Sequence, residues 1–135
     1  MNDLYNDSEY YIKKYPEMKE RIYSIIRDHD NITFVELMFF VGDESIGDNS
    51  IKLTEEYNNI IIWAGICDNF AKAIMELKFA GEIHFIICKH YSHGIPVLYL
   101  LDHMLLNLPI AKSAKKYDTL HWLPVTISTH TDDSL

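Results

Sequence analysis

Histidine and cysteine side chains gather between residues 84 and 93, where His84, Cys88, His90 and His93 form the pattern H-x3-C-x-H-x2-H. Imidazole and thiolate groups are the usual protein ligands of zinc, and the alternation of a strand would place the first three on one face. Structural zinc sites usually join ligand pairs from two separate segments, and the sequence offers no second pair of this kind. We therefore expect half-buried polar side chains here, with no metal and no other cofactor.

Cys67 is the second residue whose position could give it chemistry, because a helix is expected to begin directly after it. A thiol at a helix N-terminus feels the positive end of the helix dipole, which favours the reactive thiolate. A nucleophile also needs a base, and the surrounding segment ICDN matches no known catalytic signature. The sequence also has no glycine-rich phosphate loop, HExxH or GxSxG pattern. We expect a buried structural thiol and no enzymatic activity, with a cysteine hydrolase as a distant alternative.

Polar side chains that could contact nucleic acid fall into two groups. The first is the expected solvent face of the helix after Cys67, with Asn69, Lys72, Glu76 and Phe79. Amides and glutamates can read base edges, but one cation and one anion give almost no net attraction for phosphates. The second group follows a predicted strand, where it could reach a phosphate or the minor groove, or form only a solvated hairpin tip. This second group comprises Lys89, His90, Tyr91, Ser92 and His93.

The charge balance of the chain opposes binding to phosphates. Its 12 basic and 20 acidic residues give a formal net charge of -8, which repels nucleic acid unless the cations gather on one face. A further basic cluster, Lys112, Lys115 and Lys116 beside Tyr117, could supply a phosphate contact or only solubility.

Length and composition indicate a single folded domain. The chain has 135 residues, of which 48% are hydrophobic and 24% charged. No apolar run approaches the ~20 residues that cross a bilayer, and the acidic N-terminus is unlike a secretion signal. We expect a cytoplasmic protein without membrane association, whose two cysteines stay reduced. Residues 1–15 are expected to form an arm or a fraying helix, residues 16–127 the domain, and residues 128–135 a flexible tail.

Helical periodicity and capping residues define the first half of the domain. A helix is predicted over residues 16–28, where a proline suits the first turn and apolar residues recur on one face. Ile32 could add a short strand bridge. The spacing of Thr33 and Glu36 forms a capping box, which predicts a second helix over residues 33–40, ended by the glycine that follows.

The middle of the chain is predicted to contain a loop, a strand and a third helix. Residues 42–50 collect glycine, aspartate, asparagine and serine, so we expect an exposed loop, followed by a short helical turn near Thr54. The β-branched run at residues 60–63 predicts a buried strand. Asp68 or Asn69 is expected to cap the third helix. The buried face of this helix should comprise Phe70, Ala73, Ile74 and Leu77.

Two strands and a polar turn are predicted after the third helix. Residues 83–88 alternate in polarity, residues 90–94 supply a turn, and residues 96–101 return as the second strand of a hairpin. Residues 121–127 are expected to form a last strand, which Pro124 limits to an edge or a bulge.

The order of three helices and a hairpin resembles the winged helix-turn-helix fold superfamily over about residues 16–101. The resemblance is carried by the capped helix from Thr33, the helix NFAKAIMELKFAG and the hairpin EIHFIICKHYSHGIPVLYL. It implies an α+β, winged-helix-like domain whose third helix enters the major groove and whose hairpin forms the wing. Residues 42–66 depart from this pattern as an insertion between the second and third helices, where DNA-binding members are most alike. A C-terminal extension follows the hairpin.

The resemblance implies a small DNA-binding protein, a transcription regulator that binds double-stranded DNA as a homodimer. Dimerisation would double a weak half-site. The alternative is a winged-helix module that binds a protein partner and not DNA. The acidic balance favours this alternative, and the two readings are close. The DNA-binding residues of the first reading would be Asn69, Lys72, Glu76, Lys89, His90, Tyr91 and His93.

Overall fold

The computed structural model describes residues 3–88 and 108–130, which form helices and short strands in an α+β arrangement, as predicted. The helices are α1 (Asp3–Lys14), α2 (Met18–His29), α3 (Phe34–Val41) and α4 (Asp68–Phe79), with a short 3-10 helix η1 (Asp43–Ser45). The strands are β1 (Ile46–Lys52), β2 (Ile60–Ile66), β3 (His84–Ile87), β4 (His121–Trp122) and β5 (Val125–Ser128). Within this part of the chain, no helix has the length and apolar character that a bilayer crossing requires.

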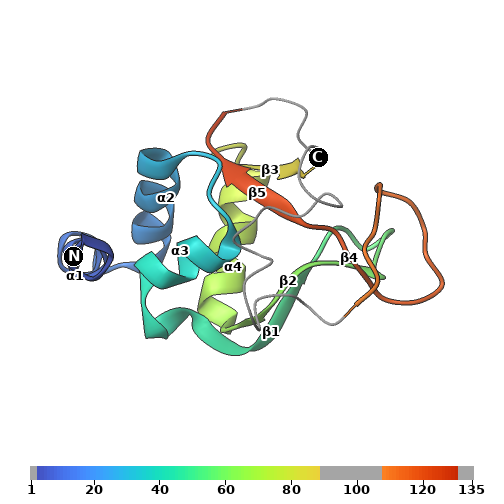
Figure 1. Cartoon of the computed structure of the whole chain (residues 1–135), viewed down its shortest axis with the longest axis horizontal. Helices are drawn as coiled ribbons and strands as arrows, with labels where there is room; N and C mark the ends of the chain where they lie inside the picture. The colour runs from blue at the N-terminus through green and yellow to red at the C-terminus, as the bar shows by residue number, and fades with distance from the viewer. Residues whose placement is uncertain (1–2, 89–107, 131–135) are drawn as a thin grey trace.

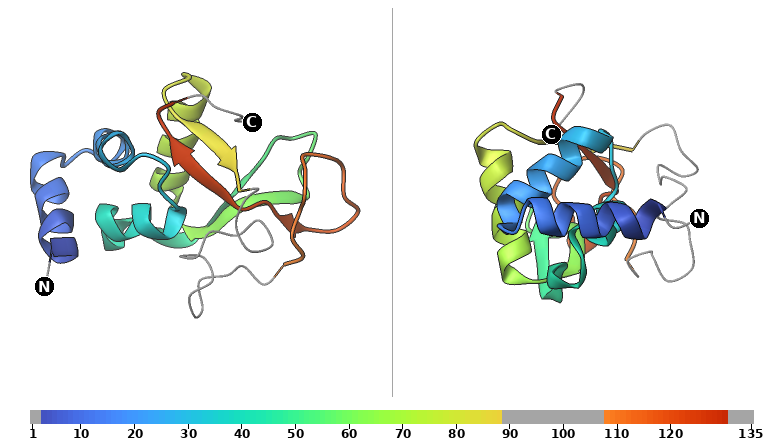
Figure 2. Two further views of the ribbon diagram at one scale, coloured as in Figure 1. Left: turned by 45° about the horizontal axis from the view of Figure 1, so that its top comes forward. Right: turned by 90° about the vertical axis from the view of Figure 1, so that its left-hand side faces the viewer.

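The strands form two small sheets. One has the order β1-β2-β4, with β1 antiparallel and β4 parallel to β2, and the other pairs β3 with β5 in antiparallel fashion. The predicted bridge at Ile32 is confirmed, because its amide and carbonyl exchange hydrogen bonds of 3.0 and 2.7 Å with Ile127 of β5. Figures 1 and 2 place α1 at one end of the molecule, with the β1–β2 hairpin reaching toward the other end and α4 between them.

Aromatic rings join the helices to the sheets at the centre of the core. The ring of Phe34, at the start of α3, lies 6.1 Å from Trp63 of β2 and 6.4 Å from Phe70 of α4, measured between ring centroids. Phe85 of β3 lies 6.1 Å from the same ring. Phe34, Phe70 and Phe85 are fully buried. A single ring in α3 therefore contacts α4 and both sheets, and burying such rings is a large favourable term in folding.

Local capping explains where α2 begins and where α3 begins and ends. The capping box of α3 is as predicted, whereas α2 begins at Met18, after a Glu17 cap, and not at Pro16 as predicted. The Glu17 carboxylate accepts a hydrogen bond of 2.8 Å from the Glu20 amide at the start of α2. In the capping box of α3, Thr33 Oγ1 accepts from the Glu36 amide at 3.1 Å, and Glu36 Oε1 accepts from the Thr33 amide at 3.2 Å. Gly42 ends α3 with a φ of 102°, a conformation that suits a residue without a β-carbon.

The prediction of a loop over residues 42–50 is wrong, because most of this segment forms η1 and β1. β1 pairs with β2, whose side chains from Ile60 to Trp63 are buried. Pairing with a buried partner overrides the weak strand propensity of glycine, aspartate and asparagine. The register between the two strands shifts at three places. Such irregularities are typical of an edge strand, and β1 lies at the edge of its sheet in the described part of the chain.

Three further predictions need correction. The turn near Thr54 is not helical, and the Thr54 hydroxyl closes it by accepting a 3.0 Å hydrogen bond from the Tyr57 amide. The last strand is two strands, because Leu123 and Pro124 separate β4 from β5 and the two pair in different sheets. Ser128, expected in the tail, ends β5 and is buried.

β3 pairs with a strand that the sequence does not predict as its partner. Among the described residues its antiparallel partner is β5, with His84 opposite Ser128 and Ile87 opposite Val125. The expected return strand, residues 96–101, lies outside the described residues. The two paired strands are therefore far apart in sequence, which no local turn signal can reveal.

Arg21 of α2 connects four backbone segments at the helical end of the molecule. Its side chain is only 2% exposed. Nε donates to the Tyr15 carbonyl at 2.8 Å and Nη2 to the Pro16 carbonyl at 2.9 Å, both between α1 and α2. Nη1 donates to the Val41 carbonyl at the end of α3 at 2.9 Å, and to Glu44 Oε1 in η1 at 2.6 Å. The guanidinium thus satisfies three carbonyl groups that the fold takes out of water.

Replacing Arg21 should destabilise the fold strongly. We expect Arg21→Met to lower the free energy of unfolding by about 3 kcal/mol, because buried carbonyls lose their donors. Arg27→Met is the matched control, since the Arg27 side chain is 48% exposed and its ion pair with Asp28 is a surface pair worth about 1 kcal/mol or less. Urea unfolding followed by circular dichroism measures both changes. Equal losses in the two variants would contradict the role given to Arg21.

A methyl group at Gly47 should also destabilise the fold, because β1 passes very close to the start of α4 at this residue. A β-carbon at Gly47 would lie 2.5 Å from Cys67 Cα and 2.8 Å from the Ile66 carbonyl oxygen. Both atoms are backbone atoms that cannot rotate away, so we expect Gly47→Ala to cost about 1–3 kcal/mol. Asp48→Ala, at the exposed next residue, should change stability little. A gain in melting temperature for Gly47→Ala would contradict this close approach.

Candidate functional site

Helix α4 presents the solvent face that the sequence predicts. Asn69, Lys72, Glu76 and Phe79 are exposed. The opposite face is buried and comprises Phe70, Ala71, Ala73, Ile74 and Leu77. Phe79 is 80% exposed, the largest value among the exposed large hydrophobic residues of the described part. The predicted division of α4 into a core face and a solvent face is therefore confirmed.

The charges on the exposed face of α4 nearly cancel. Two exposed carboxylates, Asp68 and Glu76, flank one exposed cation, Lys72. Glu76 Oε1 lies 3.5 Å from Lys19 Nζ of α2, and both side chains are about half exposed. Lys78 is partly covered, with Nζ 5.4 Å from the centroid of the Phe85 ring. This face has no excess of positive charge that would attract phosphates.

Cys67 caps the start of α4, where the sequence predicts Asp68 or Asn69 as the cap. Its Sγ accepts from the Phe70 amide at 3.4 Å and donates to the Glu44 carbonyl at 3.0 Å. Cysteine is uncommon at this position, which explains why the prediction favoured its polar neighbours. Both polar contacts of this thiol are made within the fold, but its side chain is only half-buried, whereas the sequence predicts a buried thiol.

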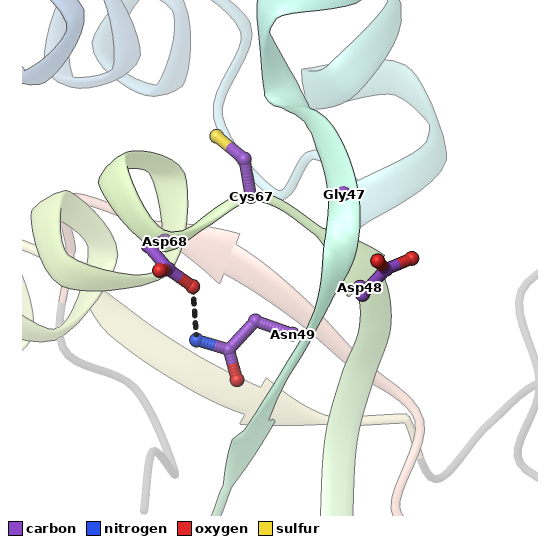
Figure 3. A pocket seen from close by; sticks show the side chains of 5 residues that line it. All are labelled: Gly47, Asp48, Asn49, Cys67 and Asp68. Atoms are coloured by element: carbon purple, nitrogen blue, oxygen red, sulfur yellow. Dashed lines mark hydrogen bonds between the residues drawn. The ribbon is translucent and has the colours of Figure 1, made fainter.

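A shallow opening lies beside this cap, between β1 and the first turn of α4 (Figure 3). Asn49 of β1 points toward Asp68, and its Nδ2 donates to Asp68 Oδ1 at 3.0 Å. Asp48 projects from β1 on the side away from Asn49 (Figure 3). The residues that line the opening are Gly47, Asp48, Asn49, Cys67 and Asp68. Two carboxylates thus stand at the N-terminal end of α4, where a phosphate would otherwise be attracted.

A groove of about 760 Å³ lies along β1 and the C-terminal half of α4. Asn49 lines both the opening and the groove, so the two adjoin at this residue. Apolar contact in the groove comes from Leu53, Met75 and Phe79, and positive charge from Lys52 and Lys78. Its remaining lining residues are Ser50, Thr54, Glu55 and Asn58. The sequence indicates only the exposure of Phe79, because the opposite wall is formed by the strand that was expected to be a loop.

A second, more apolar groove of about 610 Å³ lies between α1, α3 and the β1–β2 hairpin. Ile12, Phe39 and Ile46 line it and are 39%, 38% and 62% exposed. Among the predicted site residues within the described ranges, none lines this groove. It supplies a matched apolar control for experiments on the groove beside α4.

The other predicted nucleic-acid contacts are not among the residues that the structure describes. Lys89, His90, Tyr91 and His93 lie outside the described residues, as do two of the four candidate zinc ligands. In the described ranges 3–88 and 108–130, no group of three or more metal-binding side chains comes together.

The basic cluster Lys112, Lys115 and Lys116 lies on the exposed loop before β4, at the far end of the molecule from α1 (Figure 1). Tyr117 organises this loop. Its hydroxyl accepts from the Lys112 amide at 3.2 Å, and its ring stacks 3.9 Å from that of His121, measured between centroids. These contacts order the loop that carries the cluster, which lies apart from the exposed face of α4.

No protein-family model, curated protein or solved structure matches the chain. The surface around α4 offers an exposed ring, amide groups and charges of both signs. These groups suit the binding of a partner by contact and charge.

Cys88 should be inert toward alkylation in the folded protein. Burial raises the pKa of its thiol to about 12, so at pH 8 only about one thiol in ten thousand is the reactive thiolate. In a Cys67→Ser variant, which leaves Cys88 alone, we expect very slow reaction with iodoacetamide at pH 8 and a rate that rises about tenfold per pH unit while the fold persists. Peptide mapping by mass spectrometry measures the rate. Equally fast labelling of native and urea-unfolded protein would contradict the burial of Cys88.

Proposed function

We propose that the chain is a winged-helix-like module that binds a protein partner through the exposed face of α4 and the adjoining groove along β1. The order of α2, α3 and α4 followed by the antiparallel strands β3 and β5 supports the winged-helix part of the proposal. The β1–β2 hairpin separates α3 from α4, at the point where DNA-binding members of this fold are most alike. This insertion favours protein binding over DNA binding.

The charge of α4 also favours a protein partner. A helix that enters the major groove is held by cations near the phosphates, and about one cation is needed for each phosphate neutralised. Here Lys72 is balanced by Glu76 and Asp68 on the same exposed face, and the whole chain carries -8. The C-terminal end of α4 instead bears an exposed aromatic ring. Exposed rings beside a groove are typical of residues that contribute most to protein–protein binding.

The observation that carries the proposal is the Phe79 ring, 80% exposed at the border of the groove. An unbiased displayed-peptide library should yield ligands for the full chain, and Phe79→Ala should weaken their binding by about tenfold or more. Phe39→Ala, in the other groove, is the matched control and should leave binding unchanged. Fluorescence anisotropy measures the affinities, and NMR shifts of α4 and β1 amides locate the site.

A separate titration tests the DNA-binding alternative. The full chain is titrated with mixed-sequence duplexes at low salt, with and without Lys72→Ala. Binding that falls steeply with salt and weakens in Lys72→Ala would establish the regulator and overturn the proposal. Absence of DNA binding, together with peptides that depend on Phe79, is the outcome we expect.

A further inference from the structure

We propose that the groove between β1 and α4 binds an extended peptide that carries an acidic, an apolar and a basic side chain on one face, at positions i, i+2 and i+4 in either order. This inference rests on the proposed function and adds the chemistry of the partner. It follows from the charges in the groove and in the opening that adjoins it, the distance between them and the strand that forms one wall.

The groove and the opening that adjoins it at Asn49 carry opposite charges. In the opening, at the start of α4, Asp68 is exposed, and only one of its carboxylate oxygens accepts the bond from Asn49. In the groove stand Lys52 of β1 and Lys78 of α4. Glu55 also lines the groove, so its net charge is one positive unit. A partner with one basic and one acidic group, suitably separated, would complement both.

The separation between Asp68 in the opening and Lys78 in the groove fits an extended segment of five residues. From Asp68 to Lys78, α4 advances about 15 Å at 1.5 Å per residue. Four steps of an extended chain cover about 13 Å at about 3.3 Å per step. Side chains at i, i+2 and i+4 of a strand share one face, so both charges and the residue between them can point into the groove.

The middle of the groove is apolar. Met75 is half-buried and lies between Asp68 and Lys78 along α4, while Leu53 is 5% exposed at the base. Phe79 borders the groove beside the cations. An apolar side chain at i+2 would cover Met75 and contact the Phe79 ring. A charged or strongly polar residue at this position would lose its hydration there.

One wall of the groove is an edge strand, which favours an extended ligand over a helical one. Asn49, Ser50 and Lys52 of β1 line the groove, and β1 has a single neighbour, β2, among the described strands. Peptides bind strand edges in extended form. The Ser50 amide already donates to Asn49 Oδ1 at 2.7 Å, and the register of β1 is irregular. Side-chain complementarity, more than a complete main-chain ladder, therefore supplies the specificity.

The spacing of the charges is tested with synthetic peptides of one composition. Two peptides carry acid, apolar residue and base at i, i+2 and i+4, in the two orders, and a third places the charges at i and i+3, the spacing of one helix face. We expect at least one same-face peptide to bind the full chain about fivefold tighter or more than the i, i+3 isomer, and to weaken with added salt. Equal affinities, or a preference for i, i+3, would overturn the inference.

Charge reversal on the protein gives a second measurement. Lys52→Glu should weaken the same-face peptide about fivefold or more, and replacing the acid of the peptide by lysine should recover binding. Lys13→Glu, on the exposed surface of α1 at the opposite end of the molecule from the β1–β2 hairpin (Figure 1), is the matched control and should have no effect. Loss of binding that the compensating peptide does not recover would contradict the assigned contact.

Failure of the inference is distinguishable from failure of the proposed function. Library peptides that depend on Phe79 but ignore charge spacing would remove the inference and leave the proposed function in place. If no peptide from the library or the synthetic set binds with dependence on Phe79, both are overturned.

Discussion

The placement of the candidate site depends on the burial of Arg21 and on the contacts that continue from it. Arg21 binds the carbonyls of Tyr15, Pro16 and Val41, and its contact with Glu44 fixes η1 directly after α3. The Glu44 carbonyl in turn accepts from the Cys67 thiol. A continuous series of hydrogen bonds therefore runs from the middle of α2 through η1 to the residue that caps α4.

This series explains how an insertion between two helices can still leave the second helix well positioned. β1 and β2 separate α3 from α4 in sequence, yet both ends of the hairpin meet at one point. The Cys67 amide donates to the Ser45 carbonyl at 2.8 Å, so the residue before β1 is bonded to the residue after β2. The absence of a side chain at Gly47 allows this approach. The hairpin thus extends from a closed base and forms one wall of the groove beside α4.

Local signals in the sequence predict α2, α3 and α4 and fail at contacts between distant segments. The capping box of Thr33 and Glu36, the apolar period of α4 and the β-branched run of β2 each depend on neighbouring residues, and each is confirmed. The pairing of β3 with β5 joins residues about forty positions apart, with no local turn to mark it. The burial of Arg21 is equally unpredictable from local signals. An arginine in a short polar helix is expected to be exposed until its carbonyl partners are known.

The candidate site shows the same difference. One wall, α4, follows from local sequence signals, and the other, β1, depends on pairing that local signals do not reveal. The exposed residues of α4 follow directly from helical periodicity, so the face with Asn69, Lys72, Glu76 and Phe79 could be predicted. The groove beside it could not, because its other wall is a strand made of residues typical of loops. Those residues suit the position: a glycine permits the backbone to approach Cys67, and Asn49 bonds to Asp68 across the opening. An apolar strand would have been easier to recognise, but its exposed edge would invite nonspecific pairing with other chains. The polar composition that made β1 resemble a loop therefore makes it suitable as the wall of a selective binding groove.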